Sequence, residues 1–298
     1  MNKFAIITDT CSDLGKDLRE KYDVEYVPMH FHVGEETYVA SLDWEDMPVQ
    51  DFYNLMRAGT RITTSQVSAA DYETAFEKHL AEGKDVLSIS CSSALSASVN
   101  ASYVVAESLK AKYPERKIIC IDSLTACYGL GLLCIHASEL RAEGKSIDEV
   151  AEWVMENRNR IHQECTVDKL SYLKRAGRVT AASAFFGGLL QIKPIIISDA
   201  NGNNAAIEKM KGTAAAFQRI AERVKAQYEE VPYQKVYFAH ADSVDLIEKL
   251  KAEVMKVVPA DVEVYTGYIG PIVGASVGPG TVAVYFYGNE ITDNKKEQ

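Results

Sequence analysis

Short apolar segments alternate with amphipathic segments of helical period along most of this chain. Strands are predicted at residues 4–8, 24–27, 85–89 and 117–121, where short, largely apolar runs end in polar turns. Helices are predicted at residues 14–22, 44–56, 69–82 and 99–112, and a long apolar helix ends near Arg141. Alternating strands and helices predict an α/β fold with a parallel sheet that helices cover on both faces.

Two local features add detail to the first half of the chain. Residues 31–39 form an extended segment that is broken at 34–36 by a hairpin-type turn. Ser68 directly precedes the helix predicted at 69–82, so its hydroxyl is expected to be the N-cap of that helix.

The alternation continues through the second half. Helices are predicted at residues 147–161, 214–228 and 244–257, and strands at 235–239, 262–265 and 281–287. A boundary near residue 160 predicts two domains, an N-terminal α/β domain over 1–160 and a C-terminal α/β domain over 161–298. A ligand crevice is expected between the two.

Three of the predicted strand ends carry dense hydroxyl side chains, at residues 8–13, 90–98 and 122–125. In parallel sheets, ligands bind beyond the carboxyl ends of the strands. N-capping and turn formation account for part of these hydroxyls, but three clusters exceed what capping requires. Neutral donors can hold a carboxylate or phosphate without burying a counter-charge. The candidate donors are Thr63, Thr64, Ser92, Ser93 and Ser96.

The charge balance excludes some classes of function. The chain has 298 residues, of which 32 are Lys or Arg and 42 are Asp or Glu, and its net charge of −10 argues against a general nucleic-acid binder. No run of about 18 uncharged apolar residues is present, so no membrane-spanning helix is expected. The N-terminal residues lack the apolar region and cleavage site of a signal peptide, which predicts a cytoplasmic protein.

Metal and catalytic constellations are weakly represented. The six cysteines form no CxxC pair and favour buried free thiols over a zinc site. His30 and His32 share one strand face, but no acid or cysteine at ligand spacing completes a metal site. His240 follows a predicted strand and is a candidate for lining a cleft. Asp9 is expected to cap its own loop.

A glycine-rich segment at residues 270–280 lies between two predicted strands. It is interpreted either as a tight connecting loop or as a stretch of backbone that approaches a ligand closely. The nucleophile-elbow turn and the Walker-type and dinucleotide-binding glycine patterns are absent from the sequence. Hence the most informative pattern is anion binding by hydroxyl groups.

Several segments, in the same order along the chain, resemble signature segments of the DegV family. They are Ile7–Leu14, Thr64–Ser68, Ser92–Ser98, Val167–Val179, Gln191–Pro194 and the terminal glycine- and proline-rich loop. The matches extend from residue 4 to about residue 286, so the resemblance covers nearly the whole chain.

The resemblance implies a two-domain α/β protein that encloses one long-chain fatty acid in an apolar tunnel. Members of the family serve as the binding subunit of a bacterial fatty acid kinase, and a separate ATP-using subunit phosphorylates the carboxylate for phospholipid synthesis. The implied carboxylate ligands are Thr64 and Ser93, with Thr63 and Ser92 beside them. Arg178 matches a basic residue implicated in contact with the kinase. No catalytic residue, metal or cofactor is implied for this chain itself.

Three positions differ from the family pattern. Ser276 stands where a histidine is common near the carboxylate; it can donate a hydrogen bond but cannot become cationic. Ala97 replaces a usual glycine, and Lys211 replaces a usual arginine, which keeps the charge but loses the bidentate fork.

Two other functions stay open on the sequence. One is a stand-alone lipid carrier or sensor with no kinase partner, and the other is an acyl hydrolase that uses a cleft serine. An acyl hydrolase would need a histidine within reach of that serine.

Overall fold

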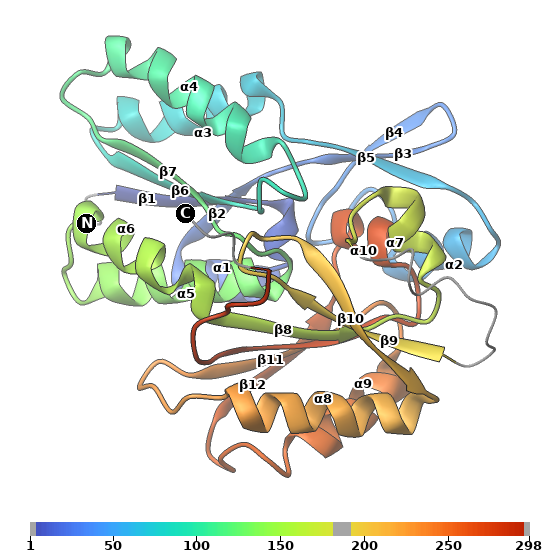
Figure 1. Cartoon of the computed structure of the whole chain (residues 1–298). Helices are drawn as coiled ribbons and strands as arrows, with labels where there is room; N and C mark the ends of the chain where they lie inside the picture. Colours follow the sequence, from blue (N-terminus) through green and yellow to red (C-terminus); the bar gives the residue numbers. More distant parts are fainter. Residues whose placement is uncertain (1–3, 181–191, 295–298) are drawn as a thin grey trace.

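The computed structural model describes residues 4–180 and 192–294, and Gln191 of the matching segment Gln191–Pro194 lies outside them. A parallel sheet of strand order β2-β1-β6-β7 is built from β1 (Phe4–Asp9), β2 (Val24–Val27), β6 (Asp85–Ser90) and β7 (Ile118–Asp122). Helices α3 (Ala69–Ala81) and α4 (Ser98–Lys112) cover one face (Figure 1). The other face is covered by α5 (Tyr128–Ala142) and α6 (Ile147–Asn157), with α1 (Lys16–Tyr22) packed on α5. This confirms the predicted α/β class and its parallel sheet.

A second, six-stranded sheet of order β10-β9-β8-β13-β11-β12 follows in the chain. Its strands are β8 (Ile161–Thr166), β9 (Ile192–Ser198), β10 (Asn204–Lys211), β11 (Lys235–His240), β12 (Glu263–Tyr268) and β13 (Val282–Tyr287). Only β11 and β12 pair in parallel, and the other pairs are antiparallel. Helices α8 (Thr213–Gln227) and α9 (Val244–Val254) pack together on one face of this sheet (Figure 1).

Helix α5 lies between the two large sheets and contacts strands of both (Figure 1). Every residue from Tyr128 to Ser138 is buried. A helix that is apolar on all sides is typical of a core position, which explains the long apolar pattern in the sequence. The large sheets use residues on either side of residue 160, yet one continuous apolar core joins them. The division into domains 1–160 and 161–298 therefore stays a prediction.

A small antiparallel sheet of order β4-β3-β5 stands beside the parallel sheet. Its strands are β3 (His30–Val33), β4 (Glu36–Val39) and β5 (Ile62–Ser65), so the predicted hairpin turn is confirmed. Helix α2 (Val49–Arg57) runs between β4 and β5 in the chain. The N-cap is also confirmed, because the Ser68 hydroxyl accepts the backbone N–H of Asp71 at 3.1 Å.

Three expectations about secondary structure are wrong. The helix predicted at 44–56 begins at Val49 instead of Trp44. The helix predicted at 147–161 ends at Asn157, and β8 already begins at Ile161. The segment 270–280, interpreted as a loop, contains helix α10 (Pro271–Val277). Pro271 presets the first helical φ angle, and Gly278, at φ 78°, ends the helix in the left-handed region.

Helix α10 packs against α2, β3, β5 and α7 (Ser171–Ala176), so it joins the small sheet to the rest of the molecule. Gly274 makes this approach possible: a Cβ there would lie 2.5 Å from the hydroxyl of Tyr53 on α2. Over the described residues, no helix has both the length and the apolar character needed to cross a bilayer.

Candidate functional site

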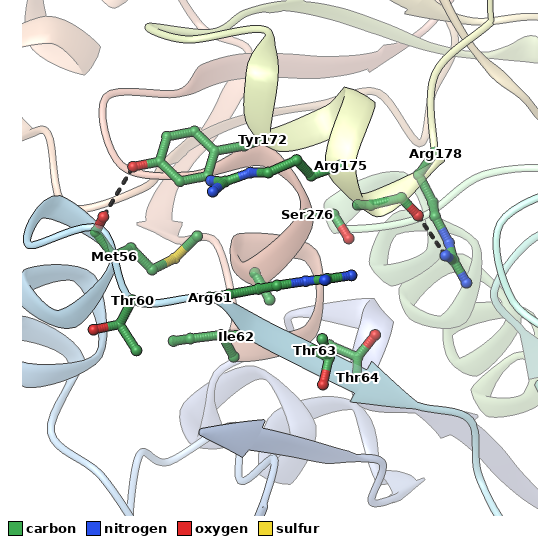
Figure 2. Close-up of a pocket in the computed structure, with 12 residues that line it drawn as sticks. Met56, Thr60, Arg61, Ile62, Thr63, Thr64, Tyr172, Arg175, Arg178 and Ser276 are labelled. Atoms are coloured by element: carbon green, nitrogen blue, oxygen red, sulfur yellow. Dashed lines mark hydrogen bonds between the residues drawn. The ribbon is translucent and has the colours of Figure 1, made fainter. Parts of the chain in front are cut away.

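A small basic pocket lies where β5, α7 and α10 meet. Its volume is about 140 Å³, and Figure 2 shows the side chains around it. The lining residues are Met56, Thr60, Arg61, Ile62, Thr63, Thr64, Tyr172, Arg175, Ala176, Arg178, Ala275 and Ser276. Two separate segments thus bring hydroxyl groups to one place: Thr63 and Thr64 come from β5, and Ser276 comes from α10.

Backbone geometry places each group. Thr63 and Thr64 pair with His32 and Phe31 across the β5–β3 ladder, which fixes their positions on the small sheet. Gly177 ends α7 at φ 69° and reverses the chain. The Arg178 guanidinium then donates through Nε to the carbonyl of Leu95 at 3.1 Å, which connects α7 to the turn before α4.

The pocket is electropositive on a protein of net charge −10. Arg61, Arg175 and Arg178 line it, and no carboxylate is among the described residues around it. Arg175 lies over the ring of Tyr172, with the guanidinium carbon 4.8 Å from the ring centroid. The Tyr172 hydroxyl is held by the carbonyl of Met56 at 3.0 Å (Figure 2). Three guanidinium groups and several hydroxyls around one small volume favour an anion.

A larger, mainly apolar cavity of about 390 Å³ adjoins the basic pocket and shares Thr64, Arg178 and Ser276 with it. Its apolar lining consists of Cys11, Met29, Cys91, Leu95, Ala97, Ala126, Ile272, Val273 and Val277. Ser65, Gln66, Ser96 and Asn204 complete the lining. The shared residues show that the polar and apolar spaces are neighbours.

A third, narrow space of about 30 Å³ continues inward from the apolar cavity. Ala126, Asn204, Val273 and Val277 line both. The narrow space is closed by core residues of the six-stranded sheet, among them Ile196 and Tyr285. The three volumes therefore form a series that leads from a basic mouth into the apolar space between the two large sheets.

Asp9 holds the wall of the apolar cavity in place. Its carboxylate accepts the backbone N–H groups of Cys11 and Cys91, each at 2.9 Å, and so ties together the turns after β1 and β6. Burial raises the pKa of Asp9 to about 6, although these hydrogen bonds oppose the rise. The predicted loop-capping role of Asp9 is confirmed.

The cysteines behave as predicted. All six are free; Cys120 is half-buried and the others are buried. Burial raises the pKa of Cys165, which lines the narrow space, to about 12, so its thiol is neutral. Among the described residues, no group of three or more metal-ligating side chains comes together.

The structure divides the candidate carboxylate ligands into two sets. Thr63, Thr64 and Ser276 line the basic pocket together with Arg178. Ser92 is fully buried and donates to the carbonyl of Gly202 at 2.9 Å, so its hydroxyl serves a turn. Ser93 is exposed and its backbone N–H meets the Asp122 carboxylate at 3.2 Å. Ser92 and Ser93 are not among the residues that line the three spaces.

Arg61 and Asn204 line the site and were missed in the sequence. Arg61 is two residues before Thr63, and alternation along a strand gave a weak signal for it. Asn204 begins β10, far from the other residues in the chain, and no local pattern identifies it.

Histidine is not among the described lining residues of the three spaces. His240 is buried, and its Nδ1 accepts the backbone N–H of Ser243 at 3.1 Å. It therefore caps the turn after β11. A serine in these spaces has no imidazole general base among the residues that line them.

The chain is similar to known proteins over nearly its whole length. A family model described as "Uncharacterised protein, DegV family" matches residues 3–289. The chain belongs to the DegV family. A DegV domain-containing protein of Clostridium perfringens is 35% identical over 289 residues, 97% of this chain and 99% of the relative.

Solved DegV structures share the fold. A DegV family protein from Thermus thermophilus, described with fatty acid binding, is 28% identical and has a TM-score of 0.85, with 96% of this chain and 99% of that one covered. DegV from Bacillus subtilis, described as a fatty acid binding protein, is 25% identical with a TM-score of 0.80, over 97% of this chain and 100% of that one. The family expected from the sequence is thus confirmed.

Proposed function

We propose that this protein binds one long-chain fatty acid, with the acyl chain in the apolar cavity and the carboxylate in the basic pocket. The observation that carries the proposal is the junction of the two spaces at Thr64, Arg178 and Ser276. Its DegV relatives described as fatty acid binding proteins support the same ligand class.

The energetics favour a long chain. Each buried methylene contributes about 0.8 kcal/mol, so a chain of about 15 methylenes contributes about 12 kcal/mol before the costs of association. The head group then needs orientation more than additional affinity. The hydroxyls of Thr64 and Ser276 would supply hydrogen bonds, and the nearby guanidinium groups would supply a favourable field.

We further propose that the bound carboxylate is presented to a separate fatty acid kinase subunit, which would form the acyl phosphate. The basic pocket supports this, because Arg61, Arg175 and Arg178 line the pocket and are also exposed to solvent. An acidic surface on a kinase could meet them. A stand-alone lipid carrier or sensor would use the same cavity without that contact.

Native mass spectrometry of the purified protein tests the lipid proposal. We expect a bound mass that corresponds to one long-chain fatty acid. In a fatty-acid titration of delipidated protein, Thr64→Val should weaken binding, since it removes a lining hydroxyl with little change of volume. Ser93→Ala is the matched control and should bind like the wild type, because Ser93 lies outside the lining. Purified protein without lipid that also fails to take it up would refute the proposal.

Arg178→Glu tests the kinase proposal. Because Arg178 lines both spaces, the variant is also expected to bind the carboxylate less tightly. The assay therefore uses a fatty acid concentration that fills the variant, as judged by native mass spectrometry. We expect a filled variant that a cognate kinase does not phosphorylate. Phosphorylation at the wild-type rate would confine Arg178 to the lipid pocket.

A further inference from the structure

A second cleft, separate from the lipid spaces, lies beside the start of α1. It has a volume of about 450 Å³, and none of its lining residues lines the other three spaces. The lining comes from the turn after β1, the loop after β4, the first residue of α5, and strands β11 and β12. Fatty acid binding gives this cleft no role.

Aromatic rings form much of its wall. Tyr128 and Tyr237 are stacked with centroids 3.7 Å apart, and Tyr265 continues the stack at 5.2 Å from Tyr237. Trp44 and Tyr268 also line the cleft and are partly exposed. These rings give the cleft a broad apolar wall, against which the alkyl or aryl part of a ligand can pack.

Asp13 also lines the cleft, although only 4% of it is exposed. Neither carboxylate oxygen has a hydrogen-bond partner among the described residues. The Cys127 thiol and the Gly270 N–H lie close enough to favour the charged form of Asp13, but neither makes a hydrogen bond of normal geometry to its carboxylate. A carboxylate that is buried without a partner is costly, because it has lost water and gained nothing in exchange.

A structural role does not account for this side chain. Asp9, in the same turn, shows what a capping aspartate does, with two backbone N–H groups at 2.9 Å. Among the residues that the structure describes, Asp13 makes a hydrogen bond only through its backbone N–H, to the carbonyl of Thr10 at 3.3 Å.

The charges of the cleft fit one class of ligand. Two carboxylates, Asp13 and Asp17, and one ammonium, Lys16, are in the lining. The Lys16 side chain is 66% exposed and lies 3.9 Å from Glu20, so it does not pair with Asp13. An anion would meet the carboxylates unfavourably, whereas a cation complements them.

We propose that this cleft binds a small organic ammonium ion, with its alkyl or aryl part against the tyrosine rings and its N–H groups toward the carboxylate of Asp13. A protonated amine supplies the hydrogen-bond donors that Asp13 lacks. The volume of about 450 Å³ lies within the range of small-molecule pockets.

Fluorescence titration of the full chain tests the proposal. Trp44 and Trp153 are the two tryptophans, so the variant Trp153→Phe leaves a single reporter in the cleft. The probes are benzylammonium and benzyl alcohol, which differ mainly in charge. We expect saturable binding of benzylammonium at least about tenfold tighter than that of benzyl alcohol.

Substitutions then assign the residues. Asp13→Asn should reduce the affinity for benzylammonium to that for benzyl alcohol, and Tyr265→Leu should weaken benzylammonium binding severalfold. Tyr103→Leu is the matched control, an exposed tyrosine outside the cleft, and should change nothing. If Asp13→Asn fails to fold, the affinity of Tyr265→Leu for benzylammonium and the comparison of the two probes on the Trp153→Phe protein still test the proposal. Equal affinities for the two probes, no saturation by benzylammonium, or full affinity in a folded Asp13→Asn variant would overturn the proposal.

Discussion

Removing the charge of Asp13 is predicted to stabilise the protein at neutral and alkaline pH. Burial raises the pKa of Asp13 from its ordinary value of 3.8 to about 7, with a smaller contribution from the like charge of Asp9. The Cys127 thiol and the Gly270 N–H oppose the rise. The Tyr53 and Tyr128 phenols face the same carboxylate and are neutral throughout this range, since burial raises their pKa values too.

The sign and size of the effect follow from proton binding. Between pH 3.8 and about 7 the folded state holds a proton on Asp13 that the unfolded state has released. Stability therefore falls as the pH rises through this interval, by about 1.4 kcal/mol per pH unit and about 4 kcal/mol in total. Asp13→Asn is close in shape and cannot ionise. We expect it to match the wild type near pH 4 and to exceed it by about 2–4 kcal/mol at pH 8, since the buried amide loses part of the gain.

Urea unfolding of delipidated protein at pH 4, 6 and 8 measures this difference. Lipid is removed because a bound ligand stabilises the folded state by itself. Asp9 and Glu164 also have raised pKa values, so the comparison with the wild type at each pH isolates the contribution of Asp13. Asp17→Asn, in the exposed first turn of α1, is the control and should follow the wild type. A difference between Asp13→Asn and the wild type that is the same at pH 4 and pH 8 would refute the reasoning.

Three further predictions concern helix α10 and the lipid site. Gly274→Ala should lower the free energy of unfolding, measured in urea, by about 1–3 kcal/mol, because its Cβ would press on the Tyr53 hydroxyl. Gly15→Ala is the control and should cost far less, because the space around Gly15 is open; equal losses of stability would contradict the packing argument. Val273→Trp should lower the affinity most for the fatty acids with the longest chains, because Val273 lines the junction between the apolar cavity and the narrow space. Titration with fatty acids of increasing length measures this, and an equal loss of affinity for every length would place the tail of the chain elsewhere. Arg61→Ala should weaken fatty-acid binding two- to fivefold at low salt. About 0.5 M salt should remove the difference in affinity between the variant and the wild type, because salt screens exposed charges. A loss of affinity that persists in salt would indicate a packing role for Arg61.

Local signals in the sequence determined much of the fold. The strand and helix alternation, the buried helix α5 and the cap at Ser68 were predicted because periodicity and capping depend on residues close together in the chain. Helix α10 was missed because its small residues and three flanking or internal glycines are typical of a loop. Packing against α2, α7 and the small sheet made it a helix.

The candidate site was only partly predictable. Ser92 and Thr64 look alike in the sequence, since each is a hydroxyl in a cluster near an element end. Only the structure shows that the Ser92 hydroxyl donates a hydrogen bond to the carbonyl of Gly202, whereas Thr64 lines the pocket. Asn204 joins the site from a distant segment, and the unpartnered state of the Asp13 carboxylate depends on what surrounds it. The sequence by itself thus determined the elements and the supply of hydroxyl groups. The tertiary structure decided which hydroxyl groups are hydrogen-bonded within turns and which line a cavity, because that depends on contacts between residues far apart in the chain.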